Sequence, residues 1–359
     1  MRFINFEYPK NQNQDRPFQI FAALLHRTMG DFTEQLLFAA SLKEMFPSAR
    51  LDVYYKPDRP YKPEIVSFSP QVDSSWPTNN RFPIDLFDTA GMRPVTGPEI
   101  WHGSGCDSPN LILTPSMSTR ELLGTFSRLA RFRLPEREKW ESALLQATND
   151  GSYCVLHYRE GGYQYSYKGD YRNIGTDQIE PIIDFVLNQK VNVVRIGHPE
   201  MTPLLPRHGF VDLSGEPFML QACAISRARF FLELSPSGPS ALANAFGIPM
   251  LRANAIILSG PATVDSIVLR RPVLDPTGKE VNGQSIAKEF PKELHVGKEN
   301  GYALGFNSIE QIEACAAEMI RSTSNVIGWR ELCEDTCQIG AATTIEWPMS
   351  PIARHRLAV

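Results

Sequence analysis

The distribution of apolar and polar residues predicts alternating strands and helices in the first part of the chain. The segment 18–26 is an apolar run, 32–46 has apolar residues at helical spacing, and 51–55 alternates as a strand does. In this order the three segments form one β-α-β unit. From 56 to 115 prolines, glycines and polar residues are dense, so part of that region is expected to form long loops.

The second part of the chain shows the same alternation more clearly. Strands are expected at 153–158, 191–196, 210–213, 228–234 and 248–251, and helices at 177–190, 217–226, after 240 and at 309–321. Thr176 is the expected N-cap of the helix at 177–190. Ser308 and Gln311 have the spacing of a capping box at the start of the helix at 309–321. Regular alternation of strands and helices predicts a parallel sheet with helices on both faces.

Length and a polar turn set the expected division of the chain. Its 359 residues exceed the usual size of one domain, so two core-bearing lobes are expected. A polar helix candidate at 136–148 leads into the turn 149–152, which places the boundary there. The predicted fold class is therefore α/β with two Rossmann-like lobes, 1–150 and 151–329, which face each other across a cleft. The tail, 330–359, is expected to pack back on the first lobe.

Composition and charge narrow the possible partners. The net charge of −4 and the pI of about 6.0 provide no basic field for nucleic acid, so nucleic acid is not expected as a partner. No apolar run approaches the roughly 18 residues of a membrane span. The first ten residues do not read as a secretory signal, so a cytoplasmic protein is expected, and peripheral membrane contact stays open.

Several familiar catalytic and cofactor motifs are absent from the sequence. Neither a G-x-x-x-x-G-K-[ST] loop nor a G-x-G-x-x-G turn after the first strand occurs, which argues against P-loop NTPases and dinucleotide oxidoreductases. The G-x-S-x-G elbow of α/β serine hydrolases is absent as well. Cys333 and Cys337 lie four residues apart without a second ligand pair, so no metal and no cofactor is expected.

A turn rich in serine and proline, 235–240, is the strongest candidate for ligand binding. It lies between an expected strand and a short helix, and it contains Ser235, Ser237, Gly238 and Ser240. Hydroxyl donors, a glycine and a helix N-terminus are features of phosphate sites. The turn therefore predicts a cradle for a phosphorylated ligand.

Two further strand ends carry residues that suit the same ligand. His157 and Arg159 lie at the end of one expected strand, and Arg195, Gly197 and His198 lie at the end of the next. Arginine can bind phosphate through two hydrogen bonds, and carboxyl ends of parallel strands meet at one sheet edge. Three strand ends of this kind point to one site, although each alone is also typical of an ordinary charged loop.

In the first lobe, Asp31 is the candidate for acid–base chemistry. Arg27, Gly30 and Asp31 come where a strand gives way to a helix, so the carboxylate would lie at the edge of the sheet. An alternative requires no chemistry, because Asp31 followed by Glu34 has the spacing of a capping box. Both interpretations stand on the sequence alone.

Two stretches of the sequence resemble a known family. Met29-Gly-Asp31 opening the first helix, and the strand, small-residue turn and Ser-Ala-Leu-Ala-Asn-Ala-Phe-Gly-Ile-Pro of 230–250, resemble the heptosyltransferase-type glycosyltransferases of the GT-B fold. A related, less characterised group of bacterial glycosyltransferases is similar at 155–160 and 193–203 as well. The resemblance covers 18–55 weakly and 153–255 more strongly.

This resemblance implies a function and roles for the candidate residues. A nucleotide-diphosphate sugar would bind the second lobe, with its diphosphate on the Ser237–Gly238 turn, and Asp31 would deprotonate an acceptor hydroxyl. The implied reaction is metal-independent and inverting, with Arg159 and Arg195 stabilising the leaving group. Bacterial surface glycan synthesis, with a glycan, lipid-linked or small-molecule acceptor, is implied too. Pro236 departs from the family, which has an acidic residue there, so the donor sugar need not be a heptose.

Two other functions fit the same fold. A sugar-nucleotide epimerase or hydrolase would use the same cradle without an acceptor, and a non-catalytic nucleotide-sugar-binding protein would need no general base. Aromatic and basic residues in and beside the proline-rich segment either line an acceptor pocket or pack the loops: Tyr54, Tyr55, Tyr61, Trp76, Arg81 and Trp101.

Overall fold

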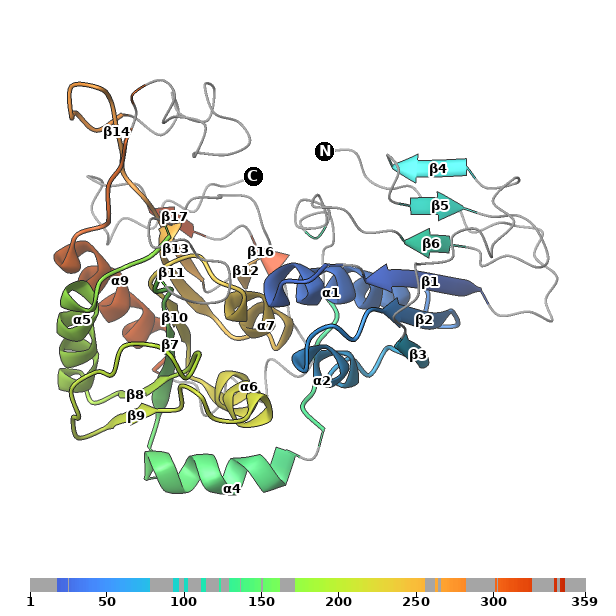
Figure 1. Ribbon diagram of the computed structural model, residues 1–359, viewed down its shortest axis with the longest axis horizontal. Coiled ribbons are helices and arrows are strands. Elements are labelled where there is room, and N and C mark those ends of the chain that lie inside the picture. Colours follow the sequence, from blue (N-terminus) through green and yellow to red (C-terminus); the bar gives the residue numbers. More distant parts are fainter. Residues whose placement is uncertain are drawn as a thin grey trace. The chain divides into compact units, whose positions relative to one another are not determined.

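The computed structural model divides the chain into two compact units, with the division between residues 135 and 136. The structure describes residues 18–24, 26–77, 93–96, 100–102, 111–113, 123, 129–135, 137–149, 151–161, 172–255, 262–263, 266–281, 301, 303–324, 339–340 and 343–345. Each unit is built around its own β-sheet (Figure 1).

The first unit contains a six-stranded sheet in the order β3-β2-β1-β6-β5-β4. Its strands are β1 (Gln19–Leu24), β2 (Arg50–Tyr55), β3 (Ser74–Pro77), β4 (Arg93–Thr96), β5 (Ile100–His102) and β6 (Leu111–Leu113). The strands β3, β2, β1 and β6 are parallel, whereas β5 and β4 run antiparallel to their neighbours. The order reverses between β1 and β6, so ligands are expected near the carboxyl end of β1.

Two helices belong to the first unit: α1 (Met29–Met45) and α2 (Tyr61–Ser67). The helix α1 buries residues all round, among them Phe32, Leu36 and Leu37, because α2 and the sheet both pack against it. Ser41, which is also buried, donates to the carbonyl of Leu37 and accepts from the backbone N–H of Ala130. The chain after the sheet is thereby anchored to α1.

The second unit is built on a seven-stranded parallel sheet, in the order β17-β13-β11-β10-β7-β8-β9. Its strands are β7 (Tyr153–His157), β8 (Asn192–Arg195), β9 (Phe210–Asp212), β10 (Phe231–Glu233), β11 (Met250–Ala255), β13 (Ile267–Arg270) and β17 (Thr343–Ile345). From β9 to β13 this is the 3-2-1-4-5-6 order of Rossmann folds. The switch point lies between β7 and β10.

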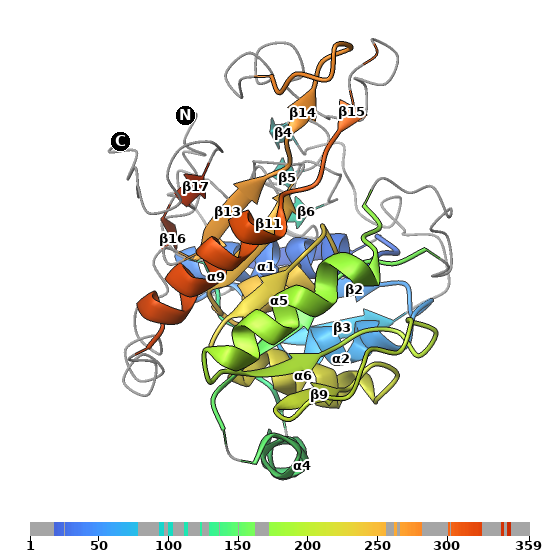
Figure 2. The ribbon, with the colours of Figure 1, turned by 90° about the vertical axis from the view of Figure 1, so that its left-hand side faces the viewer.

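Helices cover both faces of the second sheet. They are α4 (Arg137–Thr148), α5 (Thr176–Asn188), α6 (Phe218–Arg227), α7 (Pro239–Ala245) and α9 (Ile309–Ser322). The helices α5 and α9 lie side by side on one face, with α6 and α7 on the other (Figures 1 and 2). Further short strands are β12 (Ala262–Thr263), β14 (Val273–Leu274), β15 (Ala303–Leu304) and β16 (Ile339–Gly340).

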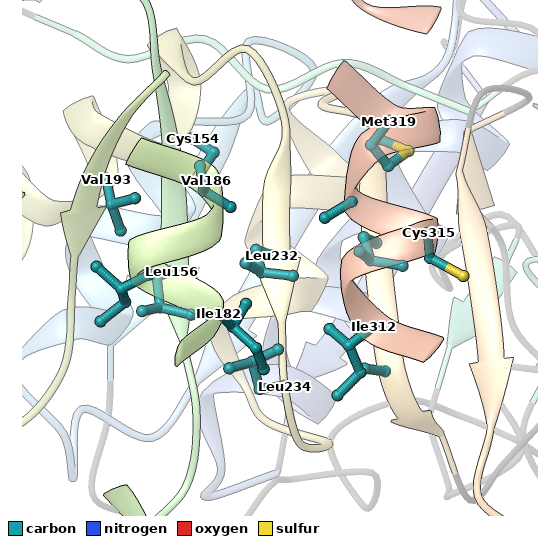
Figure 3. Close-up of a cluster of buried hydrophobic side chains, with 14 of the residues drawn as sticks. Cys154, Leu156, Ile182, Val186, Val193, Leu232, Leu234, Ile312, Cys315 and Met319 are labelled. Carbon is teal, nitrogen blue, oxygen red and sulfur yellow. The ribbon is translucent and has the colours of Figure 1, made fainter. Parts of the chain in front are cut away.

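The core of the second unit forms where α5 and α9 meet the sheet (Figure 3). Ile182 and Val186 from α5, and Ile312 and Met319 from α9, pack on strand residues such as Leu232. The predicted apolar face of 177–190 is confirmed, and so is the capping box, because Ser308 and Gln311 bond reciprocally. The N-cap of α5 is Gly175, one residue earlier than predicted.

The predicted fold class of two Rossmann-like α/β units is confirmed. The helix over 136–148, assigned to the first lobe from sequence, belongs to the second unit, where Arg227 of α6 forms an ion pair with Glu141 of α4. Within 330–359 the strand β17 joins the second sheet, and the packing of this tail on the first unit stays a prediction. No helix among the described residues is long and apolar enough to cross a bilayer.

Candidate functional site

Asp31 lies in the first turn of α1, directly after the carboxyl end of β1. Its side chain is 45% exposed. Its Oδ2 accepts a hydrogen bond from Thr28 Oγ1 at 2.5 Å, and His26 Nδ1 lies 3.8 Å from the same oxygen. In the part of the chain that the structure describes, Oδ1 has no hydrogen-bond partner. One carboxylate oxygen is thus held by Thr28, and the side chain as a whole is partly exposed to solvent.

The capping-box interpretation of Asp31 is wrong. The helix begins at Met29 with Thr28 as N-cap, and the backbone N–H of Phe32 bonds to the Thr28 carbonyl. Asp31 is therefore the third residue of the helix, and Glu34 is buried further along it. A carboxylate in the first turn still interacts favourably with the helix dipole, but it does not define where this helix starts.

Arg27 and Gly30, predicted on the acceptor side, lie at the same edge as Asp31. Arg27 is 67% exposed, with Nε 3.5 Å from Asp58 Oδ2, whereas Gly30 is buried in the first turn of α1. Asp58 Oδ1 also lies 2.8 Å from Nζ of Lys62, which is fully buried and lies over the Phe32 ring. Burial lowers the pKa of Lys62, although the Asp58 carboxylate opposes that shift.

The aromatic residues proposed for an acceptor pocket have different environments. Tyr54 and Tyr55 are buried in β2, where they contribute to the core. Trp76 on the edge strand β3 is 56% exposed, and the Tyr61 hydroxyl donates to the Arg27 carbonyl at 2.7 Å. Arg81 and the side chain of Trp101 lie outside the described residues.

A polar row crosses the carboxyl ends of three strands of the second sheet. His157 on β7 and Arg252 on β11 both pair in register with Glu233 on β10. Residues that pair in register on neighbouring parallel strands project from the same face of the sheet. Glu233 is 1% exposed, and its Oε2 accepts from Arg252 Nε at 2.7 Å. The row spans the switch point between β7 and β10.

The 235–240 turn contains several internal hydrogen bonds, and its role as an anion cradle stays a prediction. Glu233 Oε1 accepts from the backbone N–H of Ser237 at 2.8 Å and from its hydroxyl at 3.2 Å. Ser235 is buried and accepts from the Arg159 backbone N–H at 2.8 Å, while Ser240 donates to the Ser237 carbonyl. The buried Glu233 carboxylate thus accepts from both donors of Ser237.

Gly238 and Arg159 at this edge are predicted to contact the ligand, and both contacts stay predictions. Gly238 is the N-cap of α7, with a φ of −65° that any residue adopts, and its place in the turn does not depend on glycine. Arg159 follows β7 with a partly exposed side chain, at the sheet edge predicted from sequence. Since parallel strands present ligand sites at this edge, Gly238 and Arg159 remain candidates for contact with a diphosphate.

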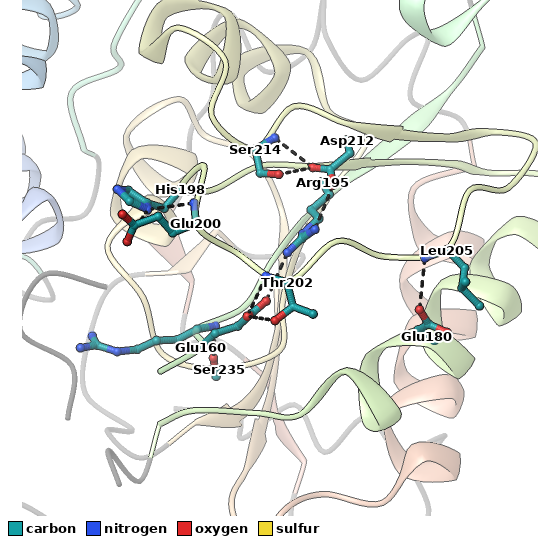
Figure 4. A network of polar contacts seen from close by, with 11 residues as sticks. Glu160, Glu180, Arg195, His198, Glu200, Thr202, Leu205, Asp212, Ser214 and Ser235 are labelled. Atoms are coloured by element: carbon teal, nitrogen blue, oxygen red, sulfur yellow. Dashed lines mark hydrogen bonds and ion pairs between the residues drawn. The ribbon is translucent and has the colours of Figure 1, made fainter. Parts of the chain in front are cut away.

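Arg195 is the centre of a buried ion-pair network instead of a ligand-facing cation (Figure 4). Its side chain is fully buried, with NH1 2.9 Å from Asp212 Oδ2 and NH2 3.2 Å from Glu160 Oε1. The guanidinium also lies 5.0 Å from the centre of the Tyr158 ring. Glu160 in turn accepts from the backbone and hydroxyl of Thr202, so the network joins two loops at the sheet edge.

Gly197 has a structural environment as well. Its N–H donates to Gln221 Oε1 at 3.0 Å, and a Cβ would lie 2.1 Å from Met201 Sδ. Its role in donor binding stays a prediction. His198 is 30% exposed, and its Nδ1 accepts from the Glu200 N–H at 3.2 Å (Figure 4). His198 therefore stays a candidate contact.

His157 has an unusual protonation equilibrium. Its Nδ1 is buried without a hydrogen-bond partner among the described residues. Burial lowers its pKa to about 4, although the Glu233 carboxylate opposes this shift. The ring is therefore neutral near pH 7.

The low pKa of His157 predicts a loss of stability in acid. Between pH 6.5 and 4 the His157 imidazole is protonated in the unfolded chain but stays neutral in the folded chain. The free energy of unfolding therefore falls as the pH falls. We expect a loss of about 2 to 3 kcal/mol between pH 7.5 and 4.5 from this group. Urea unfolding of the parent and His157→Asn at both pH values measures the difference, and equal losses in the two proteins would contradict it.

The three cysteines in the described part of the chain, Cys154, Cys223 and Cys315, are all buried. Cys154 and Cys315 are buried, and burial raises the pKa of each thiol to about 12. Cys333 and Cys337 lie outside the described residues. Among the described residues, no three His, Cys, Asp or Glu side chains gather as metal ligands would.

The network around Glu233 was missed from sequence, although one signal was present. Glu233 is a single acid inside the apolar run 230–234, and a charge at such a position requires a buried partner. Arg252 occupies the equivalent position in the next strand. Thr28 with Asp31, and Asp58 with Lys62, are pairs three and four residues apart that the sequence pattern did not single out. The contact of Arg27 with Asp58 depends on where two loops meet.

The arrangement defines a two-unit α/β protein with polar residues at the carboxyl edge of each sheet. Solved structures that match it include a family 9 glycosyl transferase from Veillonella parvula, at 14% identity and a TM-score of 0.49, over 84% of this chain and 97% of that one. An E. coli heptosyltransferase with ADP matches at 14% identity and a TM-score of 0.44, over 76% and 99% of the two chains. E. coli ADP-heptose LPS heptosyltransferase II matches at 12% and 0.43, over 65% and 84%.

Heptosyltransferases are the family that the sequence resembles. At these identities and TM-scores the likeness concerns the fold and assigns no activity to this chain. No protein-family model matches the sequence, and no curated protein matches it significantly.

Proposed function

We propose that the protein is a glycosyltransferase that moves a sugar from a nucleotide-diphosphate donor to an acceptor hydroxyl. The observation that carries the proposal is the environment of Asp31. A half-exposed carboxylate lies in the first turn of the helix that follows the strand at the switch point of a Rossmann-like sheet, with Oδ2 held by Thr28 and no partner for Oδ1 among the described residues. A general base needs these properties, because it must reach a hydroxyl proton in a fixed orientation.

In the proposed reaction, Asp31 takes the proton of the acceptor hydroxyl as its oxygen attacks the anomeric carbon. The new carbon–oxygen bond forms while the bond to the donor diphosphate breaks, and the leaving diphosphate keeps the electron pair. Displacement on one face of the sugar inverts the anomeric configuration. The reaction therefore needs one base and a means to stabilise the leaving diphosphate.

The proposed role of the second unit is to bind the donor near the switch point of its sheet. Arg159, His198 and Gly238 are the contacts that the proposal assigns to the donor, with Arg159 as the cation for the diphosphate. In this proposal Ser235, Ser237 and Ser240 support the turn, because their hydroxyl groups are bonded to the protein, and His157 is buried beside the donor site without a direct contact. The transfer is proposed to be independent of metal ions.

The proposal also includes the wider role implied by the sequence resemblance. This role is bacterial surface glycan synthesis in the cytoplasm, with a glycan, lipid-linked or small-molecule acceptor. Donor breakdown without an acceptor would instead identify a hydrolase or an epimerase that works on the same donor.

A nucleotide panel tests donor binding directly. One of ADP, UDP, GDP and CMP is expected to raise the melting temperature, because a ligand that binds only the folded state stabilises it by about 2.7 kcal/mol at 100 times its Kd. Thermal unfolding should be followed with EDTA present, and the shift should persist. Orthophosphate at equal concentration is the control for nonspecific anion effects.

Two results would contradict the donor proposal. If no nucleotide shifts the transition more than orthophosphate does, then the protein does not bind a nucleotide donor in this concentration range. If the shift requires a divalent cation, then the metal-independent mechanism is wrong.

A further inference from the structure

The hydroxyl of Thr28 is not used as N-cap hydroxyls usually are. Thr28 is the N-cap residue of α1, a position where threonine normally accepts a hydrogen bond from a backbone N–H of the first turn. The Thr28 side chain makes no such bond. Its Oγ1 instead donates to Asp31 Oδ2 at 2.5 Å.

The backbone around Thr28 is fixed from both sides. The Arg27 carbonyl accepts from the Tyr61 hydroxyl of α2 at 2.7 Å, and the Thr28 carbonyl accepts from the N–H of Phe32 at 3.1 Å. The backbone position of Thr28 therefore does not depend on the bond of its hydroxyl to Asp31. A donor held in this way can orient the carboxylate.

We propose that Thr28 is a positioning residue for Asp31. This inference rests on the proposed role of Asp31 as the general base. The hydroxyl holds Oδ2 and so turns Oδ1 outward, and His26, with Nδ1 3.8 Å from the same oxygen, lies beside Oδ2 as well. The two side chains leave one oxygen of Asp31 for the acceptor proton.

A positioning role affects turnover more than binding. Without its donor the carboxylate can rotate, and only a fraction of the bound complexes then has Oδ1 aimed at the acceptor hydroxyl. Small errors in the placement of a catalytic group cost up to about 100-fold in rate. The KM values for donor and acceptor depend on other contacts and change little.

The test compares Thr28→Val, which keeps the shape and removes the hydroxyl, with Thr28→Ser, which keeps the hydroxyl. We expect kcat to fall by about 10- to 100-fold in Thr28→Val and to recover in Thr28→Ser, with both KM values nearly constant. Thr33→Val is the matched control, because Thr33 in the same helix donates to the Met29 carbonyl and not to Asp31. Its kcat should equal that of the parent.

Crystal structures of the variants provide a measurement that does not depend on turnover. Asp31 should occupy one rotamer in the parent and in Thr28→Ser, and several in Thr28→Val. An unchanged Asp31 rotamer in Thr28→Val would overturn the inference, and so would full kcat in Thr28→Val when Asp31→Asn is inactive. If Asp31→Asn keeps full activity while Asp31 loses its rotamer in Thr28→Val, then the proposed base is wrong and the orientation by Thr28 still stands.

Discussion

Replacing Asp31 with asparagine is expected to reduce turnover by about 100- to 10,000-fold, which is the usual contribution of a general base. The amide has nearly the shape of the carboxylate, and its oxygen can still accept from Thr28, but it cannot take the acceptor proton. Donor affinity should change little, because Asp31 belongs to the first unit and the proposed donor contacts belong to the second. Steady-state kinetics and calorimetric titration of the nucleotide measure the two effects separately.

Asp177→Asn is the matched control for Asp31→Asn. Asp177 is also an exposed aspartate in the first turn of a helix, so both substitutions remove a charge that interacts with a helix dipole. Each should cost less than about 1 kcal/mol of stability, and Asp177→Asn should keep full turnover. Equal activity of the two variants would refute the assignment of Asp31 as the base.

The substitution Arg195→Met is expected to destabilise the second unit by about 3 kcal/mol or more. It leaves the Glu160 and Asp212 carboxylates without the cation that both contact, and removal of one member of a buried ion pair typically costs about 3 to 5 kcal/mol. Asp212 is 32% exposed, so water offsets part of the penalty. Urea unfolding measures the loss.

Arg207→Met separates burial from the mere number of ion pairs. Arg207 also contacts two carboxylates, Glu180 and Asp184, but these lie nearer to solvent, and the Asp184 side chain is 54% exposed. Its loss should cost about 1 kcal/mol or less, as surface ion pairs do. An Arg195→Met protein with parent stability and lost nucleotide binding would show instead that Arg195 contacts the donor.

The fold was predictable to the extent that local patterns reflect burial. The apolar stripe of α5, with Ile179, Ile182 and Val186, arises because one side of that helix packs on the sheet, and the prediction was confirmed. The run 18–26 was recognised for the same reason, since β1 is buried on both sides in the middle of its sheet. The apolar spacing predicted a helix from residue 32, whereas α1 begins at Met29. The start was missed because Met29 and Gly30 do not extend the helical spacing of apolar residues.

The candidate site was predictable in its location more than in its contacts. Arg195 is the last residue of its strand, Arg159 and Ser235 lie just beyond theirs, and Asp31 lies in the helix after β1, at the edge where parallel sheets present ligand sites. The sequence does not show that Arg195 would be buried between Glu160 and Asp212. Glu160 is 35 positions and Asp212 is 17 positions from Arg195 in the sequence. Only the pairing of β7, β8 and β9 brings the three residues together.

By itself, the sequence determined two α/β units, their main helices and the strand ends that carry polar residues, because hydrophobic periodicity and turn residues act over short distances. Only the tertiary structure decided the direction in which those polar groups point. The hydroxyl and N–H of Ser237 were predicted as donors for a phosphate. In the structure both donate to Glu233, the last residue of β10, and Arg252 on the neighbouring strand β11 compensates the charge of Glu233. A donor has a limited number of bonds, and the side chain that takes them is fixed by packing across the sheet.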